Sequence, residues 1–189
     1  MDDLTLRYET AQFLSTGDPN AILTSLPSGS GVLHIANTQP ANWVSGYVGS
    51  SAGRWKIHGQ EKKHFGDRAE TSVLELAGLN HESMQDKVFE EWEITANTLA
   101  INVSCFPSHL QNAYFEDHSP APGKWAKSHI LIEELHQVPA FKGISSILAP
   151  SASGLALGIS GLVLVADPRS TPMRMIRTGA YSDFFPTQD

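Results

Sequence analysis

The chain has 189 residues, of which 41% are hydrophobic, so it is long and apolar enough to build a core and is not a disordered chain. Its 13 basic and 20 acidic residues give a formal net charge of -7, which argues against a free-standing nucleic-acid-binding protein, because such proteins carry a basic patch. The single cysteine, Cys105, excludes an internal disulfide framework and suits a reducing compartment.

The N-terminal segment fits two structures. In residues 2–14, Leu4, Leu6 and Tyr8 alternate as in a strand, but a helix capped by one of the two aspartates at its start fits as well. The acidic beginning of the chain has no apolar run, so we expect no signal peptide.

Most of the remaining chain consists of short runs rich in β-branched and aromatic residues, separated by Gly, Pro and Ser turns, and such runs predict strands. The predicted strands are residues 32–35, 43–48, 54–58, 71–76, 88–94, 99–106, 155–157, 162–165 and 173–177. Residues 107–124 predict a long surface loop because they are rich in proline, and residues 125–135 predict a strand or a short helix.

The organising stretch is residues 41–57, in which two β-rich runs flank the small-residue turn Gly49–Gly53. With no alternation of strands and helices and no internal repeat, the chain predicts an all-β fold. We expect an antiparallel β-sandwich of about eight strands, jelly-roll-like, forming a single domain over residues 1–189.

Residues 144–166 carry no charged side chain, and this raises the question of a membrane span. The first half contains several serines and Pro150, and the only strongly apolar run is Leu162–Val165. A short apolar run bounded by Gly and Pro is typical of a buried strand, so we expect no membrane span.

The eight histidines form no recognisable metal motif. His58 and His64 lie six residues apart with Glu61 between them, which matches no known ligand spacing. The pair His81-Glu82 begins like a zinc-protease helix, but Gln85 stands where the second histidine should be. We therefore predict no metal site and no cofactor.

The sequence gives little support for a catalytic nucleophile either. The segment Gly158–Gly161 suggests a serine elbow around Ser160, but position 162 is leucine where the motif needs glycine. Cys105 alternates with Val103 on the apolar face of a predicted strand, so we expect a buried structural thiol. No catalytic residue is predicted, and the chain is expected not to be an enzyme.

Three segments resemble picorna-like virus capsid proteins. Their residues are Tyr47-Val48-Gly49 with Ala52-Gly53-Arg54-Trp55-Lys56-Ile57, the segment Leu4–Tyr8, and Met175–Phe184 near the C-terminus. The arginine–glycine step usual after the turn is absent, because Ser50-Ser51 stand there, and Ser182 replaces an acidic residue of the ending.

This resemblance implies a structural capsid subunit of a small icosahedral virus, in the virion and, during assembly, in the host cytoplasm. It implies a piece cut from a polyprotein that associates with copies of itself and with sibling capsid subunits, and a weak contact with genomic RNA on the inner face. The alternative is a small β-barrel or sandwich, cupin- or lipocalin-like, that serves as a ligand-binding or interaction module.

Overall fold

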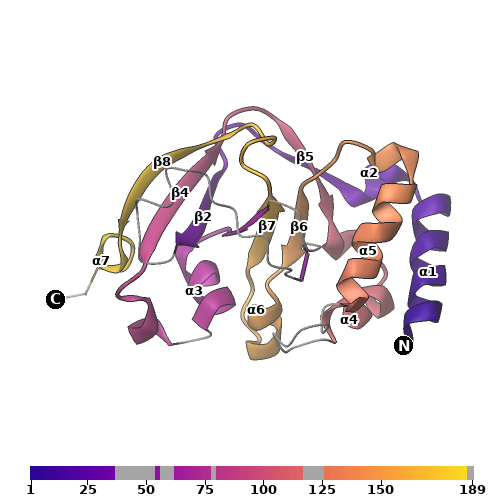
Figure 1. Cartoon of the computed structure of the whole chain (residues 1–189), viewed down its shortest axis with the longest axis horizontal. Helices are drawn as coiled ribbons and strands as arrows, with labels where there is room; N and C mark the ends of the chain where they lie inside the picture. The colour runs from indigo at the N-terminus through magenta and orange to yellow at the C-terminus, as the bar shows by residue number, and fades with distance from the viewer. Residues whose placement is uncertain (37–53, 56–61, 78–79, 117–125, 187–189) are drawn as a thin grey trace.

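The structure, a computed structural model, describes residues 1–36, 54–55, 62–77, 80–116 and 126–186. It contains a single mixed sheet with helices packed against it (Figure 1). The strands are β1 (Leu23–Leu26), β2 (Gly31–Ala36), β3 (Lys63–Gly66), β4 (Val88–Ile94), β5 (Thr98–Asn102), β6 (Ile147–Pro150), β7 (Leu162–Ala166) and β8 (Met173–Ala180). The α-helices are α1 (Asp3–Thr16), α2 (Pro19–Ile22), α3 (Ala69–Ala77), α4 (Ser108–Phe115), α5 (Ala126–Gln137), α6 (Ala152–Leu157) and α7 (Tyr181–Phe184). The short 3₁₀-helices are η2 (His81–Met84), η3 (Val103–Cys105) and η4 (Pro139–Phe141).

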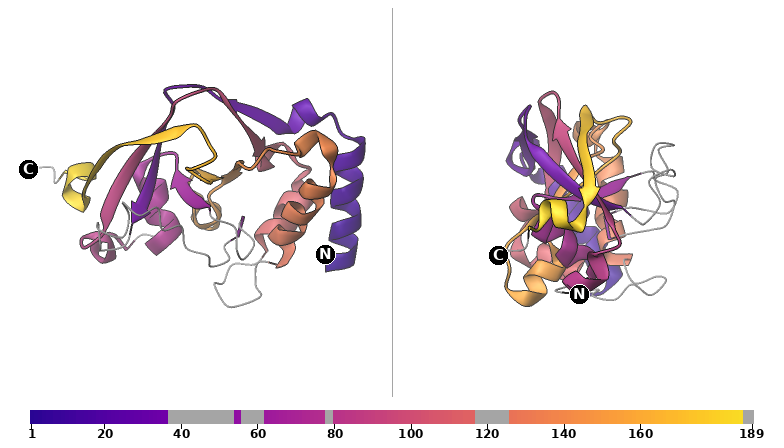
Figure 2. Two further views of the ribbon diagram at one scale, coloured as in Figure 1. Left: turned by 45° about the horizontal axis from the view of Figure 1, so that its top comes forward. Right: turned by 90° about the vertical axis from the view of Figure 1, so that its left-hand side faces the viewer.

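The strand order is β1-β5-β6-β7-β3-β2-β4-β8. Strands β5 and β6 are parallel and the other neighbouring pairs are antiparallel. The sheet arches over the molecule, with α1, α4 and α5 together at one end, α3 and α6 beneath its middle, and α7 at the opposite end (Figures 1 and 2).

The predicted all-β sandwich is therefore wrong. The chain does form an eight-stranded, largely antiparallel sheet in its described part, but helices replace the second sheet. Residues 71–76, 107–124 and 155–157 were expected to be a strand, a loop and a strand, whereas α3, α4 and α6 lie in them.

Helix α3 shows why alternation misled the prediction. Four consecutive residues, Thr71 to Leu74, are all buried, because the helix is covered on several sides. Thr71 lies against Gly161, the Ser72 hydroxyl donates to the carbonyl of Leu33 in β2, and Val73 packs in an apolar cluster with β2 and β4. A helix buried on several sides loses the 3.6-residue periodicity of an amphipathic helix.

Several local predictions are confirmed. Strand β4 has the predicted bounds, β2 and β8 contain the runs predicted for them, and β7 covers the apolar run Leu162–Val165. In β7, Val163 and Val165 face the cluster under α1, α4 and α5, while Leu164 faces the other side of the sheet. The strand is apolar on both faces because both faces are buried. Within the described ranges, no helix has the length and apolar character needed to cross a bilayer.

The N-terminal ambiguity is resolved in favour of the helix. Asp2 caps α1 by accepting a hydrogen bond from the backbone N–H of Thr5 at 2.9 Å. Leu6, Thr10 and Leu14 form the buried face of α1. Cys105, expected to be buried, is exposed, because η3 ends the strand before it and changes the direction of its side chain.

One buried polar contact joins α1 to α4 inside the apolar cluster. The hydroxyls of Thr10 and Tyr114 are fully buried and lie 2.8 Å apart. Burial raises the pKa of the Tyr114 hydroxyl, so it is a neutral hydrogen-bonding group at physiological pH.

We expect Tyr114→Phe to lower the free energy of unfolding by about 1–3 kcal/mol, because it leaves the Thr10 hydroxyl buried without that partner. The double variant Thr10→Val/Tyr114→Phe should recover most of this loss, because both polar groups are then removed. Urea denaturation measures both, with Tyr8→Phe as the control, since Tyr8 is 68% exposed. A double variant no more stable than Tyr114→Phe would contradict the assignment.

Candidate functional site

The candidate site lies where α3 meets α6. Ser151 is the N-cap of α6, and its hydroxyl accepts a hydrogen bond from the backbone N–H of Gly154 at 2.9 Å. The same hydroxyl donates to Glu75 Oε1 of α3 at 2.5 Å, across 76 positions of sequence. Ser151 is 1% exposed, whereas Glu75 is half-buried. A buried hydroxyl therefore holds a carboxylate that still reaches solvent.

The two oxygens of Glu75 have different surroundings. Oε1 accepts from the Ser151 hydroxyl and from the backbone N–H of Ser153 at 3.3 Å. Oε2 makes no hydrogen bond to any residue that the structure describes, and no described Lys, Arg or His forms an ion pair with Glu75. Capping α6 requires only the serine, so the carboxylate is an additional feature with one oxygen available as an acceptor.

Glycines allow the elements around this junction to approach each other. A Cβ at Gly154 would lie 2.5 Å from the carbonyl oxygen of Ile159, and a Cβ at Gly161 would lie 2.7 Å from the Thr71 hydroxyl. A Cβ at Gly66 would lie 2.5 Å from the Ser72 hydroxyl. The contacts at Gly66 and Gly161 fix α3 against β3 and against the segment before β7, and the contact at Gly154 fixes α6 against the turn that follows it. The positions of Glu75 and Ser151 are therefore set by the packed backbone.

Further polar contacts anchor the start of α3. Arg68 donates to the carbonyl of Ser160, in the segment that follows α6. Asp67 accepts from the Thr71 hydroxyl at 2.5 Å. The candidate serine elbow is thus part of the turn that supports α3: the backbone carbonyl of Ser160 is used, and its hydroxyl has no described role.

The arrangement can do specific chemistry. The Ser151 hydroxyl is bonded to a carboxylate, and no histidine of the described ranges contacts it, so among these residues it lacks the base that activates a serine nucleophile. Ser151 therefore acts as a positioning residue. The group offered to a ligand is the Glu75 carboxylate, which can accept a hydrogen bond from a hydroxyl, an amine or a water, or take up its proton.

The histidines do not assemble into a site in the described part of the chain. His34 and His64 lie on β2 and β3, where the His34 ring contacts the His64 backbone carbonyl at 2.5 Å and burial lowers the pKa of His34 to about 3. His81 contacts the Tyr181 hydroxyl at 2.6 Å. Over the described ranges, no three His, Cys, Asp or Glu side chains are grouped as a metal ion would require. His58, Glu61 and most of the organising stretch 41–57 lie outside the described residues.

Two residues of the organising stretch are described. Trp55 is buried, with its ring against Tyr114 and Phe115 of α4, and Arg54 donates to the backbone carbonyl of Tyr114 at 3.0 Å. The aromatic and basic pair Arg54-Trp55 therefore packs on a helix, and its aromatic ring is not available to stack on nucleic-acid bases.

The fold is a mixed α/β architecture built on one arched sheet. No protein-family model matches the chain, and no curated protein matches it. The structure is similar to a chain in the crystal structure of the M. tuberculosis MbcT–MbcA toxin–antitoxin complex, with a TM-score of 0.58. The similarity covers 96% of this chain and 100% of that chain at 14% sequence identity, so it establishes the shared fold.

This comparison corrects the functional expectations. The predicted capsid function and virion location are wrong, because the fold has helical layers and the matched structure is a toxin–antitoxin complex. Of the segments that resembled capsid strands, Leu4–Tyr8 lies in a helix and residues 43–53 are outside the described chain. The expectation of a protein without enzymatic activity finds no support in this comparison.

Proposed function

We propose that this chain is the toxin-type member of a bacterial toxin–antitoxin pair and acts as an enzyme through Glu75. The proposal combines the near-complete fold similarity to a chain of such a complex with the geometry at the junction of α3 and α6. The observation that carries it is the 2.5 Å contact that fixes the half-buried Glu75 carboxylate while leaving Oε2 without a described partner.

In the proposed reaction, Glu75 accepts a hydrogen bond or a proton from the substrate, or from a water that attacks the substrate as the bond to its leaving group breaks. Ser151 holds Oε1, so the carboxylate does not need to reorient during the reaction. A positioned acid or base of this kind contributes about 10²–10⁴-fold to a rate. A cell would then tolerate the protein only while a partner restrains it, and the similar structure is that of a toxin bound in a complex with an antitoxin.

The test is induced expression of the chain in a bacterial host, scored by viable counts. We expect the wild type to stop growth and Glu75→Gln to permit it, because the amide keeps the size of the side chain but cannot take up a proton. The matched control is Glu70→Gln, in the first turn of the same helix and exposed, which should remain toxic. Thermal unfolding of the purified variants checks that both are folded. Equal toxicity of wild type and Glu75→Gln, or a harmless wild type at confirmed expression, would overturn the proposal.

A further inference from the structure

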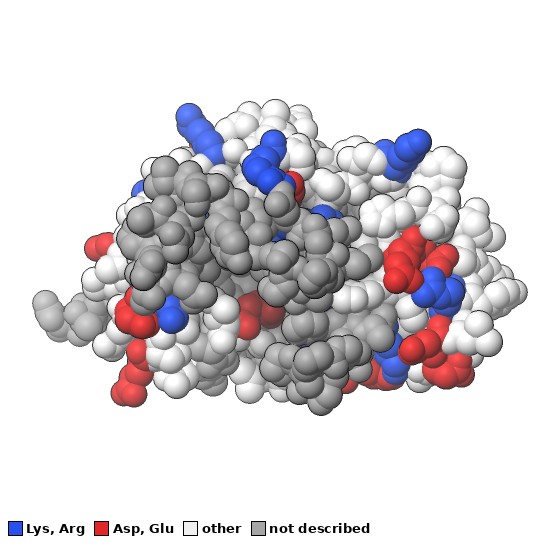
Figure 3. All heavy atoms as spheres, in the orientation of Figure 1, with Lys and Arg blue, Asp and Glu red and all other residues white. Residues whose placement is uncertain are grey.

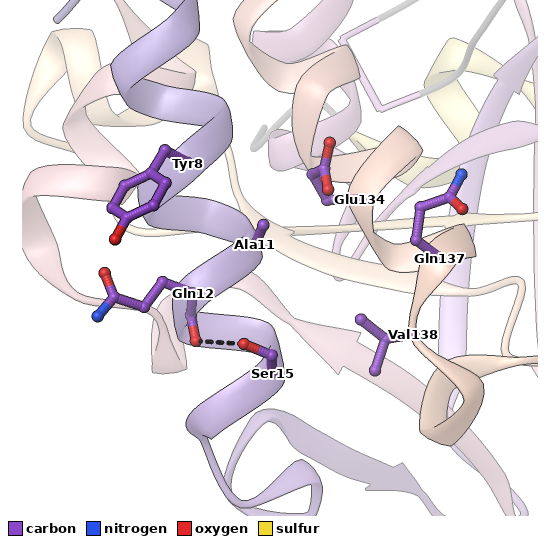
Figure 4. Close-up of a pocket in the computed structure, with 7 residues that line it drawn as sticks. All are labelled: Tyr8, Ala11, Gln12, Ser15, Glu134, Gln137 and Val138. Carbon is purple, nitrogen blue, oxygen red and sulfur yellow. Dashed lines mark hydrogen bonds between the residues drawn. The ribbon is translucent and has the colours of Figure 1, made fainter.

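A groove of about 460 Å³ runs between α1 and the C-terminal end of α5 (Figure 4). These two helices lie at one end of the molecule, away from α3, the helix that carries Glu75 (Figure 1). It is lined by Tyr8, Ala11, Gln12 and Ser15 of α1 and by Glu134, Gln137 and Val138 on the other side. The Ser15 hydroxyl is bonded to the backbone carbonyl of Gln12, so it is satisfied within its own helix.

Helix α1 carries more apolar surface than its packing uses. Leu6 and Leu14 form its buried face, but Leu4 and Tyr8, one turn apart on another face, are 80% and 68% exposed. This second apolar strip leads along the helix to Ala11 in the groove. Adjacent exposed apolar side chains beside a groove are typical of a surface that receives another protein.

The groove is acidic at its rim. Arg7 of α1 donates to Glu133 at 2.5 Å and to Glu134 at 2.6 Å, so two carboxylates share one guanidinium and one negative charge is left over. Both signs of charge gather over α1 and α5 on the face shown in Figure 3. The whole chain has a formal net charge of -7.

This charge selects the occupant. A second copy would bring another acidic groove or surface of a protein with the same net charge, and an anionic lipid surface would also be repelled. A cationic side chain from a partner would instead offset the negative charge that is left over in the cluster of Arg7, Glu133 and Glu134. The two walls of the groove are helical, so a third helix can lie along them in the helix-in-groove mode.

We propose that this groove binds an amphipathic helix of a partner protein, with apolar side chains against Tyr8 and Val138 and a lysine or arginine directed at the cluster of Arg7, Glu133 and Glu134, which carries one surplus negative charge. The inference rests on the proposed function, since the partner is then the antitoxin-type protein. Because the groove is separate from Glu75, the helix would hold the partner on the toxin without entering the reaction centre.

The test uses two fluorescein-labelled helical peptides that share a leucine face and differ only in its flanks, lysine in one and glutamate in the other. Fluorescence anisotropy with the full chain should show the lysine peptide binding at least about tenfold more tightly. The substitution Ala11→Arg should weaken binding of the lysine peptide by about tenfold or more relative to the wild-type chain, because the new side chain fills the groove and repels the peptide. Gln85→Arg adds the same charge at an exposed position distant in sequence and should leave the affinity unchanged.

Hydrogen exchange with the lysine peptide bound should protect residues 8–15 and 134–138. Equal affinity for the two peptides, or unchanged affinity in Ala11→Arg, would overturn the groove assignment. The outcome is independent of toxicity: a chain that binds the peptide but does not stop growth retains the groove and loses the proposed function. A toxic chain that does not discriminate between the peptides retains the function and loses the groove.

Discussion

Lys63→Met is expected to lower the free energy of unfolding by about 3–5 kcal/mol, because it leaves a buried carboxylate without its cation. Lys63 Nζ lies 3.3 Å from Glu90 Oε2, and the two side chains are only 6% and 2% exposed. Trp92 Nε1 donates to the same oxygen at 2.9 Å, and Lys63 Nζ also lies over the Trp92 ring. Burial lowers the pKa of Lys63, while the neighbouring Glu90 carboxylate opposes that shift.

The second variant of this test separates the buried charge from the loss of packing. Lys63→Met/Glu90→Gln removes both charges but keeps an amide oxygen to accept from Trp92, so it should recover most of the lost stability. Arg174→Met is the surface control. Arg174 forms an ion pair with Glu93 at the surface, where the arginine side chain is 68% exposed. This pair should contribute about 1 kcal/mol or less to stability.

Urea denaturation of the three variants gives the comparison. For a chain of this size, the loss in Lys63→Met corresponds to a fall in Tm of roughly 10 °C. A double variant as unstable as the single one would show that Lys63 acts through packing rather than charge. Similar losses of stability in Lys63→Met and Arg174→Met would show that burial does not make the Lys63–Glu90 pair more important than an exposed pair.

The strand predictions are correct where the pattern of apolar residues matches the pattern of buried residues in the strand. Strand β4 alternates in part and was placed correctly, and β7 was identified by its short apolar run between glycine and a turn. The prediction of helices failed where burial on several sides removed the 3.6-residue periodicity of apolar residues. In α3 four successive residues are buried, and α4 begins directly after Pro107, inside residues 107–124, where the prolines predicted a loop.

The candidate site was missed for a different reason. Glu75 and Ser151 are far apart in the sequence and belong to no spaced motif. Glu75 was assigned to the alternation of a strand, where a charged residue suggests a solvated face. A local signal existed at Ser151, because a serine that follows Pro150 and precedes small residues is a typical N-cap. Its contact with a carboxylate from another helix depends on tertiary packing alone.

That packing leads to the second large effect, which concerns Gly154. Gly154→Ala is expected to abolish toxicity in the expression assay, although the position is helical and alanine normally stabilises a helix by about 0.5–1 kcal/mol over glycine. The new Cβ would lie 2.5 Å from the backbone carbonyl oxygen of Ile159 and 3.0 Å from the Ser151 hydroxyl. A backbone atom cannot rotate away, so Ser151 and the following turn must shift, and the 2.5 Å contact to Glu75 is lost.

In Gly154→Ala, the cost of overpacking opposes the gain in helix propensity. Overpacking of this kind costs about 1–3 kcal/mol, which exceeds the gain in helix propensity, so Gly154→Ala should be less stable than the wild type by about 1–2 kcal/mol. Gly158→Ala is the matched control. Gly158 ends α6 with φ +69° and has open space around its Cβ position, so alanine there is strained by about 1–2 kcal/mol without pushing on Ser151.

The two variants should therefore be destabilised to a similar extent but differ in toxicity, with Gly158→Ala active and Gly154→Ala inactive. Viable counts and urea denaturation measure the two quantities separately. Loss of toxicity in both variants would mean that the effect follows stability, and a toxic Gly154→Ala would mean that the Ser151–Glu75 contact is not needed. Inactivity confined to Gly154→Ala would instead tie the activity to the geometry at the junction of α3 and α6, since equal destabilisation would then have unequal consequences.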